Sequence, residues 1–529
     1  MEKQGRRRPW RRIGRWTPVS VKSGIGTQIK GSKLASIIGS LDLRETRIPI
    51  VIPFAVTSVF AIVQLFLGCD PLVMLLSMAA ILVTFLPFHF NGRDLYSLFA
   101  MLVGLRYVGV ALIIKTLDRQ PLQTNLFDPL ATYAWMVVLM SVYTAVFMLA
   151  RRFDRGAEII SFPTDAGNLR RLAVISFCLG GAALLFIESK GSGDEGHAGA
   201  GVAFMVAATL QSLLILAIIA EASRNLEMSR GRNLFSSFLA FMLVVAFLAA
   251  SALNARGSFL SCLIGLLLIG FIYKAIKPQY IVSGLLFIAF FLNFVSPVIL
   301  YVRSQRQLPV LQFIEYTRDT AVRAATDPPF LAYLKTVTNA KSISAEAGEY
   351  DYYGDRSNVQ NRLSFVALFD SIYNQDKGLV PLGMKTIWQS IDGVAPGFLG
   401  FIKRPESLGD WLGWETGLVA EGNEPFINFG LPMEGYTSWG WIGAIVYPFL
   451  FVFPFLWVFS KIASFRQPLP TSIFIFTEIQ AGLIESTSDG FMNGATRGAP
   501  VLFAALFALY WIFFRGAARE EQIAAPAES

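Results

Sequence analysis

Long apolar runs separated by short polar connections fill most of this chain of 529 residues. A helix needs about 20 apolar residues to cross a bilayer, and these runs reach or approach that length. The pattern therefore predicts membrane-spanning helices near residues 48–68, 71–88, 95–117, 130–150, 172–187, 202–220, 234–253, 257–273, 280–300, 438–459, 470–485 and 498–514. Twelve spans, an even number, would place both ends of the chain on the same side of the membrane.

Residues 301–437 interrupt this pattern, because they contain no convincing span but twelve Lys or Arg and sixteen Asp or Glu. Their aromatic and leucine residues are frequent enough to bury a small core, which argues against disorder. Short helices are expected at 310–325 and 359–373, so the segment is interpreted as a folded, mostly helical cap. The expected organisation is a basic tail (1–47), a first membrane bundle of about nine spans (48–300), the loop domain (301–437), a second membrane segment of about three spans (438–515) and a tail (516–529).

Composition supports the membrane interpretation. The chain is 54% hydrophobic and only 16% charged, and its mean hydropathy is +0.52. A soluble protein of this size carries roughly a quarter of its residues as charged side chains. This deficit excludes a soluble enzyme, a disordered scaffold and a nucleic-acid-binding protein, despite the net charge of +8. The predicted fold class is an all-α polytopic integral membrane protein.

The positions of the basic residues predict the orientation. Residues 1–47 carry twelve Lys or Arg and three acids, which is typical of a tail that faces anionic lipid in the cytoplasm. Alternate connections are rich in Lys and Arg, whereas the short loops on the other side hold only Arg119, Lys190, Arg256 and Arg497. The positive-inside rule then places both termini in the cytoplasm and residues 301–437 outside it.

Few residues of the kinds that bind metals or form disulfides are present. The three cysteines lie far apart without a Cys-x-x-Cys pair, and there are two histidines, His89 and His197. Neither zinc nor a disulfide framework is supported by this pattern, and we expect no metal and no cofactor. Any chemistry must then use carboxylates, arginines or hydroxyl groups.

The first candidate for such chemistry is Arg256, in the short turn 254–258 (Asn-Ala-Arg-Gly-Ser) that opens an apolar helix. The glycine after it lets the turn approach a ligand closely. A cation beside a helix N-terminus makes an anion site, and a phosphate at the membrane surface is the expected ligand. The alternative is a plain interfacial arginine whose charged end reaches water.

Four further arginines are candidates for the same anion. Arg303 and Arg306 lie three residues apart and share a helix face if the preceding span continues outward. Arg362 and Arg404 lie later in the loop segment and would have to converge on that place. Arginine suits bidentate phosphate binding better than lysine does. The alternative for each is a solvated surface charge.

Carboxylates interleaved with aromatic residues follow in the loop segment. Trp411, Trp414 and Glu415 are candidates for sugar binding, because aromatic faces stack on sugar rings and acids bind hydroxyl groups. Glu434 stands before a glycine at the expected membrane boundary and is the candidate general base. The alternative is a surface loop whose aromatic residues pack on the cap.

Two charges lie inside expected spans, Arg106 and Glu478. Charges within a membrane are costly and are usually paired. We therefore expect a structural ion pair between these two residues, with a transport pathway as the alternative.

With these residues in view, the sequence resembles the O-antigen polymerase family of bacterial repeat-unit polymerases. The similarity covers the overall plan, with many spans and one large loop late in the chain. The turn 254–258 is similar to the small-Arg-Gly motif of that family, and the stretch 429–443 (Phe-Gly … Glu-Gly … Gly-Trp-Ile-Gly) resembles its entry to the next span.

The resemblance implies a metal-independent, inverting glycosyltransferase of the bacterial inner membrane with its loop in the periplasm or outside the cell. Its partners would be undecaprenyl-pyrophosphate-linked oligosaccharides, membrane lipid and a membrane protein that regulates chain length, but no nucleic acid. By this resemblance Arg256 binds the pyrophosphate and acts in catalysis, and Arg303 and Arg306 assist by their placement. The alternatives are an O-antigen ligase-like transferase, a transporter of lipid-linked sugars and an envelope assembly subunit. The loop segment has no histidine, which argues against a ligase.

Overall fold

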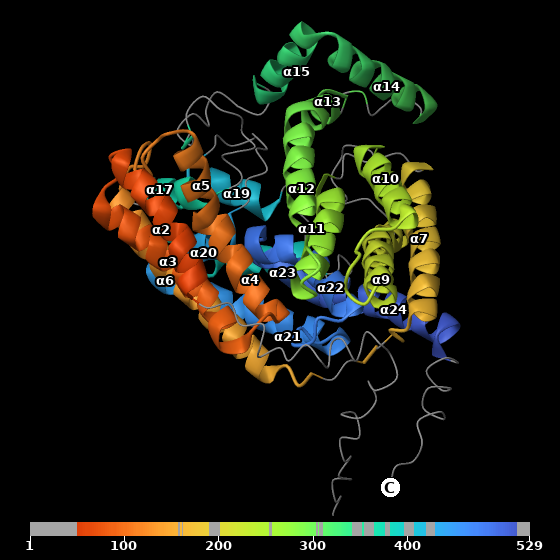
Figure 1. Ribbon diagram of the computed structural model, residues 1–529. Helices are drawn as coiled ribbons and strands as arrows, with labels where there is room; N and C mark the ends of the chain where they lie inside the picture. Colours follow the sequence, from red (N-terminus) through yellow and green to blue (C-terminus); the bar gives the residue numbers. More distant parts are fainter. Residues whose placement is uncertain are drawn as a thin grey trace, which may run out of the picture.

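The computed structural model describes residues 50–156, 159–160, 162–189, 202–252, 256–302, 305, 310–340, 352–353, 364–375, 381–395, 407–418 and 429–515. Across these ranges the regular elements are helices and π-helical turns, without a strand (Figure 1). The prediction of an all-α fold is therefore confirmed for the part of the chain that is described.

The helices of the first bundle follow the expected spans closely. They are, with η marking a π-helical turn, α2 (Val51–Phe66), α3 (Pro71–Asn91), α4 (Leu95–Gly104), η2 (Leu105–Gly109), α5 (Val110–Leu117), α6 (Pro129–Phe153), α7 (Ala166–Ser189), α8 (Val202–Gln211), α9 (Leu213–Met228), α10 (Ser237–Ala252), α11 (Arg256–Ile272), α12 (Pro278–Phe290), η4 (Phe291–Val295) and α13 (Ser296–Val302). Consecutive elements such as α4, η2 and α5 form one long helix with a π-helical turn inside it.

The remaining helices belong to the loop segment and the last membrane part. They are α14 (Val310–Thr326), α15 (Pro328–Ala340), α17 (Val366–Gln375), α18 (Lys385–Val394), α19 (Leu408–Glu415), α20 (Leu431–Tyr447), η8 (Pro448–Val452), α21 (Phe453–Ile462), α22 (Pro470–Glu485), α23 (Ser488–Asn493), η9 (Gly494–Gly498) and α24 (Ala499–Phe513). The helices expected at 310–325 and 359–373 correspond to α14 and α17.

Seven helical segments among the described residues are long and apolar enough to cross a membrane. They are Pro71–Asn91, Leu95–Leu117, Pro129–Phe153, Ala166–Ile187, Val206–Met228, Leu431–Ile462 and Ser488–Phe513, and three shorter apolar helices accompany them. The structure is consistent with a polytopic membrane protein, whereas the number of twelve spans stays a prediction.

The short helix α22 lies in the centre of this bundle. Every residue from 470 to 477 is buried, and α22 contacts α4, α9 and α11. Phe476 stacks on Phe99 of α4 with the ring centroids 4.1 Å apart, and Phe99 stacks in turn on Phe147 of α6. A helix that is apolar all round is expected inside protein rather than against lipid. This explains why a helix of only 16 residues is stable here.

α20 consists of two arms that meet at a kink. Trp439 and Gly440 have non-helical backbone angles, and Gly440 has φ +59°, which glycine adopts without strain. The kink presses Gly435 against Gly443, where a methyl group on Gly435 would lie 2.3 Å from the Gly443 carbonyl oxygen. The glycines of the stretch 429–443 therefore allow the first arm to fold back onto the second.

Part of the loop segment is fastened to the first bundle. The Asp370 carboxylate of α17 accepts hydrogen bonds from the N–H groups of Phe127 and Asp128 at 2.7 and 3.0 Å, just before α6. Thr132 donates a third at 2.8 Å. The hydroxyl of Tyr352 donates to the Leu122 carbonyl at 2.7 Å. These contacts hold residues 352–353 and α17 on the turn between α5 and α6.

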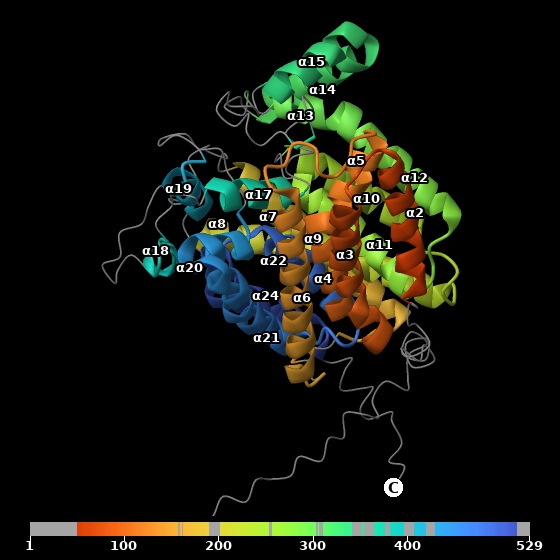
Figure 2. The same ribbon diagram turned by 90° about the vertical axis from the view of Figure 1, so that its left-hand side faces the viewer.

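The other part of the loop segment, α14 and α15, packs on α13 through a small apolar cluster of Val298, Val302, Ala324 and Leu334. Both views show these two helices beyond one end of the bundle, which we call the cap end (Figures 1 and 2). The loop segment thus has two separate attachments among the described residues, and its folding as one domain stays a prediction.

Candidate functional site

Four of the five arginines predicted to bind pyrophosphate lie in segments that the structure does not describe. Arg303, Arg306, Arg362 and Arg404 lie outside the described residues. Arg256 is the first residue of α11, which confirms that the turn 254–258 opens a helix, although the side chain lies outside the description. The roles of these five residues in binding pyrophosphate stay predictions.

Arg106 does not pair with Glu478, so that prediction is wrong. The Arg106 guanidinium instead forms an ion pair with Glu485, the last residue of α22. Glu485 lies seven residues after Glu478, which is about 10 Å farther along the helix axis at about 1.5 Å per residue. The sequence pattern does not single out Glu485, because it stands at the boundary of the predicted span 470–485, where a charge is unremarkable. The side chains of Arg106 and Glu485 are 21% and 30% exposed, so solvent reaches both.

A π-helical turn positions Arg106. The residue lies in η2, where the helix is locally wider than an α-helix, and such turns are frequent at functional sites. Phe365 of the loop segment lies beside the guanidinium, with its ring centroid 6.0 Å away. The Nε–H of Arg106 is buried and has no hydrogen-bond partner among the described residues. The guanidinium therefore keeps a donor that an anion can use.

The N-terminus of α11 and the Glu485 end of α22 lie on the same side of a contact between the two helices. A methyl group on Gly265 of α11 would lie 3.5 Å from the Thr477 hydroxyl oxygen of α22, and the Tyr273 hydroxyl donates to the Pro468 carbonyl at 3.1 Å. The two helices are therefore antiparallel. Arg256 precedes Gly265 by nine residues and Glu485 follows Thr477 by eight, so both helix ends lie about 12–14 Å from this contact along the helix axes. We call this region, with Arg106, Glu485, α23 and the first turn of α11, the mouth.

Glu434 is fully buried next to the mouth. Its carboxylate accepts hydrogen bonds from the N–H of Ser488 at 2.7 Å and from the Ser488 hydroxyl. The Ser390 and Ser488 hydroxyl oxygens lie 2.5 Å apart, which joins α18 to the same network. In this arrangement Glu434 ties the first arm of α20 to the N-terminus of α23. Its role as a general base stays a prediction.

The predicted sugar-binding residues belong to α19. Ser407 caps this helix by accepting from the Asp410 N–H at 3.1 Å, and such a cap satisfies an otherwise free backbone donor. Trp411 is buried, whereas Trp414 and Glu415 are partly exposed. Lys385 of α18 forms an ion pair with Glu415 at 2.6 Å. The helix α18 packs on both α19 and α23, so it links the predicted sugar-binding residues of α19 to the mouth. Binding of sugar by Trp411, Trp414 and Glu415 stays a prediction.

Two buried tyrosines of the loop segment lie beside Lys115 of α5. Tyr352 and Tyr353 are buried, and burial raises the pKa of both hydroxyl groups above the ordinary value. Their hydroxyls therefore stay neutral near pH 7. The Lys115 ammonium lies 4.2 Å from the Tyr352 ring centroid, a favourable cation–π distance. These residues act as a scaffold for the segment rather than as acids or bases.

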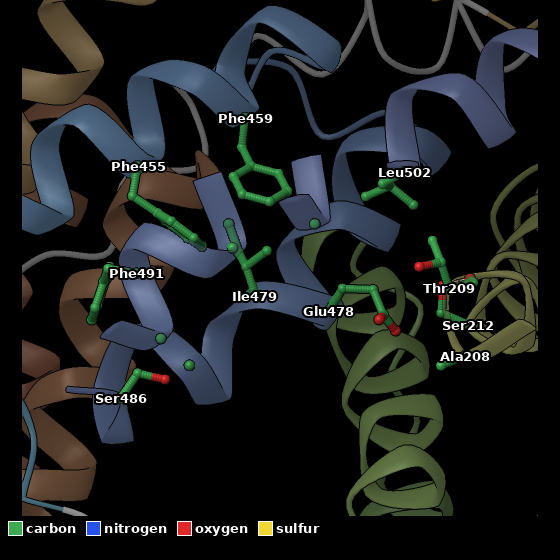
Figure 3. A pocket seen from close by; sticks show the side chains of 14 residues that line it. Ala208, Thr209, Ser212, Phe455, Phe459, Glu478, Ile479, Ser486, Phe491 and Leu502 are labelled. Atoms are coloured by element: carbon green, nitrogen blue, oxygen red, sulfur yellow. Dashed lines mark hydrogen bonds between the residues drawn. The ribbon is translucent and has the colours of Figure 1, made fainter. Parts of the chain in front are cut away.

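A cavity of about 370 Å³ lies between α8, α21, α22, α23, η9 and α24 (Figure 3). Glu478 extends into it from α22, opposite Thr209 and Ser212, while Phe455 and Phe459 form another part of the wall. Ser486, the residue after Glu485, also lines the cavity, so it begins next to the mouth. Glu478 is therefore placed in a different site from Arg106.

The described residues contain no group of three or more His, Cys, Asp and Glu side chains that could hold a metal ion. The mouth offers instead a guanidinium, a carboxylate and a helix N-terminus, which can bind an anion and accept a proton. Fold and site together define a polytopic helical membrane protein with a charged mouth around Arg106 and Glu485. Comparisons of the chain with protein-family models, with curated proteins and with solved structures found no match.

Proposed function

We propose that this protein is a membrane glycosyltransferase that polymerises lipid-pyrophosphate-linked sugar repeat units at the mouth. The observation that supports this most is Arg106, which has an unused buried donor and pairs with Glu485 at the end of α22, the end that points the same way as the N-terminus of α11. A guanidinium and a helix N-terminus that face the same phosphates can hold a pyrophosphate without a metal ion. The resemblance to the O-antigen polymerase family agrees with this chemistry.

In the proposed reaction, a sugar hydroxyl of one lipid-linked unit attacks the anomeric carbon of the chain carried by another. The new glycosidic bond forms as the bond to the pyrophosphate breaks. Arg106 and Arg256 stabilise the negative charge that develops on the leaving pyrophosphate. The hydroxyl proton passes to a carboxylate, and attack from the opposite face inverts the anomeric centre.

Glu485 is the carboxylate that suits the proton transfer best. It is 30% exposed at the mouth, whereas Glu434 is fully buried and already accepts two hydrogen bonds from Ser488. A general base must reach the hydroxyl from which it takes the proton. When the pyrophosphate attracts Arg106, Glu485 is released from the ion pair and becomes available.

The other partners follow from the same proposal. The substrates are undecaprenyl-pyrophosphate-linked oligosaccharides, and Trp414 with Glu415 binds their sugar rings next to the mouth. The protein lies in the bacterial inner membrane with both termini in the cytoplasm and the cap end outside, in accordance with the basic residues of the connections. Labelling of single cysteines introduced at the tip of α15 tests this orientation.

The direct test uses membranes that contain this protein and a lipid-linked repeat unit. Arg106→Lys and Arg256→Lys keep the charge but lose the planar fork that binds two phosphate oxygens. We expect each to slow polymer formation by about 30- to 1,000-fold, which corresponds to about 2–4 kcal/mol of lost transition-state stabilisation. Chelators should leave the rate unchanged.

Arg119→Lys is the matched control, since Arg119 is an exposed arginine of the turn after α5 and does not belong to the mouth. It should keep the wild-type rate. Wild-type rates for both Arg106→Lys and Arg256→Lys, with normal protein levels, would refute the assignment of the mouth as the pyrophosphate site.

A transporter of a lipid-linked sugar is the second candidate. The observation in its favour is the cavity beside Glu478, because charged side chains that face a cavity inside a membrane bundle often mark a transport path. Flipping of a fluorescent lipid-linked sugar in proteoliposomes, without elongation of the glycan, would favour this candidate over the transferase.

A further inference from the structure

Glu478 differs from the other acids within the bundle, because it has no hydrogen bond and no ion pair to any described residue. Glu221 is fully buried but pairs with Arg170 at 2.9 Å and with Arg224 at 3.1 Å. Asp154 is also buried and accepts hydrogen bonds from Ser464 and from the Phe465 N–H. The protein therefore compensates its other internal carboxylates with its own groups.

An uncompensated carboxylate within a bundle is expensive, since removing it from water costs several kcal/mol that no partner returns. The cavity offers space for a positive charge that no described side chain provides. Its volume of about 370 Å³ exceeds by far the roughly 30 Å³ that one water molecule occupies in the liquid. The cavity therefore has room for a small ion and for water beside Glu478.

The groups that face Glu478 define the charge of this ion. From α11, Cys262 lies close enough to interact with it electrostatically. The other elements at the cavity present Thr209 and Ser212 from α8 and its end, Phe455 and Phe459 from α21, Ser486 and Phe491 beside α23, and Leu502 from α24. Among these residues Cys262 is the one titratable group, and none carries a positive charge.

We propose that Glu478 is the binding site of one exchangeable monovalent cation, either a proton or a sodium ion. A single carboxylate with neighbouring hydroxyl oxygens matches one positive charge. A divalent ion requires more oxygen ligands, commonly including further carboxylates. The site is independent of the proposed transferase activity, although the cavity wall includes Ser486, the residue after Glu485 of the mouth.

The test uses the apolar reagent dicyclohexylcarbodiimide on the purified full-length protein in detergent. This reagent adds to a protonated carboxyl group in apolar surroundings: the carboxylate oxygen bonds to the carbodiimide carbon, the proton goes to a nitrogen, and the adduct rearranges to a stable N-acylurea. Intact-mass measurement counts the adducts, and peptide mass spectrometry locates them. We expect the adduct on Glu478.

Two series of labelling measurements, one in pH and one in sodium concentration, distinguish a proton from a sodium ion. For a proton site, the labelling rate falls as the pH rises and does not change with sodium at constant ionic strength. For a sodium site, sodium at about ten times its Kd slows the labelling about tenfold by competition, whereas potassium and choline do not. Either result supports the proposal.

Variants test whether the reagent reaches Glu478 through the cavity. Glu478→Gln should lose the adduct, while Glu485→Gln, which changes the neighbouring acid at the mouth, should keep it. Gly498→Leu fills the cavity where a side chain has room, since the nearest atom to a methyl group there is 4.0 Å away. The matched control is Gly284→Leu in α12, another helical glycine with open space around it.

We expect Gly498→Leu to slow the labelling and Gly284→Leu to leave it unchanged. If Gly498→Leu does not fold, Leu502→Phe fills the same cavity from the next turn. The proposal is overturned if the folded wild-type protein shows no adduct on Glu478. It is also overturned if the adduct forms at a rate that responds neither to pH nor to sodium, or if filling the cavity leaves the rate unchanged.

Discussion

The mouth and the cavity each use a carboxylate of α22, and the two carboxylates have opposite surroundings. Glu485 at the mouth forms an ion pair with Arg106, and both side chains are partly exposed. Glu478 lies about two helical turns deeper and faces a cavity without a partner among the described residues. The residue type is the same, so the difference in role comes from what the neighbouring helices supply.

This comparison shows which charges the fold satisfies by itself. At the mouth, Arg106 and Ser488 satisfy Glu485 and Glu434. In the cavity, α8, α21 and α24 contribute hydroxyl and apolar groups but no cation. Mutations should therefore lower stability at the mouth and leave it unchanged or raised in the cavity.

The largest effect is expected from Glu434→Ala. It leaves the N–H and the hydroxyl of Ser488 without their acceptor in a buried place, and each unsatisfied donor costs about 1–3 kcal/mol. We expect the free energy of unfolding to fall by about 3 kcal/mol. Unfolding of the purified protein, followed by circular dichroism in increasing denaturant, measures this change. Glu434→Gln retains an acceptor and should lose less; a wild-type midpoint for the alanine variant would contradict the network.

The next effect is expected from Arg106→Gln, which leaves Glu485 without its partner. Breaking a buried ion pair costs about 3–5 kcal/mol, and partial exposure of this pair reduces the loss to about 2 kcal/mol. The double variant with Glu485→Gln should recover part of that loss, and the same unfolding measurement on all four proteins gives the coupling. Additive effects of the two single variants would show that the pair contributes nothing.

Glu478→Gln should have a small effect of the opposite sign. No hydrogen bond or ion pair to a described residue is lost, and the cost of holding a carboxylate inside the bundle is removed. We expect the free energy of unfolding to stay the same or to rise by up to about 1 kcal/mol. A decrease of the size expected for Arg106→Gln would mean that Glu478 has a structural partner after all.

The smallest effect is expected from Lys385→Gln at the edge of the mouth. The ion pair with Glu415 is solvent-accessible, with the lysine side chain 51% exposed, and exposed pairs contribute about 0–1 kcal/mol. We expect a change below about 0.5 kcal/mol, and less still in high salt, because salt screens exposed charges. A larger loss would show that α18 and α19 depend on this pair for their packing.

Local patterns predicted many elements well. The stretch 310–325 was expected to be helical and forms α14 over Val310–Thr326, because its amphipathic spacing is a property of the segment alone. The same kind of pattern places the first arm of α20 and Arg497 in loops, and the structure places both in helical segments. Arg497 lies in the helical turn η9 and donates a hydrogen bond to the Val394 carbonyl. Contacts with distant segments stabilise such turns, and a local pattern does not record them.

The pairing of charges illustrates the same limit. Arg106 and Glu478 were the two evident charges within predicted spans, so pairing them was reasonable on sequence alone. The sequence does not reveal how far η2 and α22 are displaced along each other, and a shift of about 10 Å selects Glu485 instead. The predicted site residues Arg303, Arg306, Arg362 and Arg404 lie outside the described residues, so their convergence stays a prediction.

The apolar runs alone predict a helical membrane protein, because the length and apolarity of a run decide whether it can satisfy its backbone inside a bilayer. The same pattern predicts that a helix opens at the turn 254–258, where α11 begins. Which acids have a partner depends on how the helices pack. Ser488 donates hydrogen bonds to Glu434 and Arg106 pairs with Glu485, whereas Glu478 faces the cavity without a partner among the described residues. The energy of a charge depends on groups within a few ångströms of it, and these groups lie 54 residues away in the chain for Glu434 and 379 residues away for Glu485.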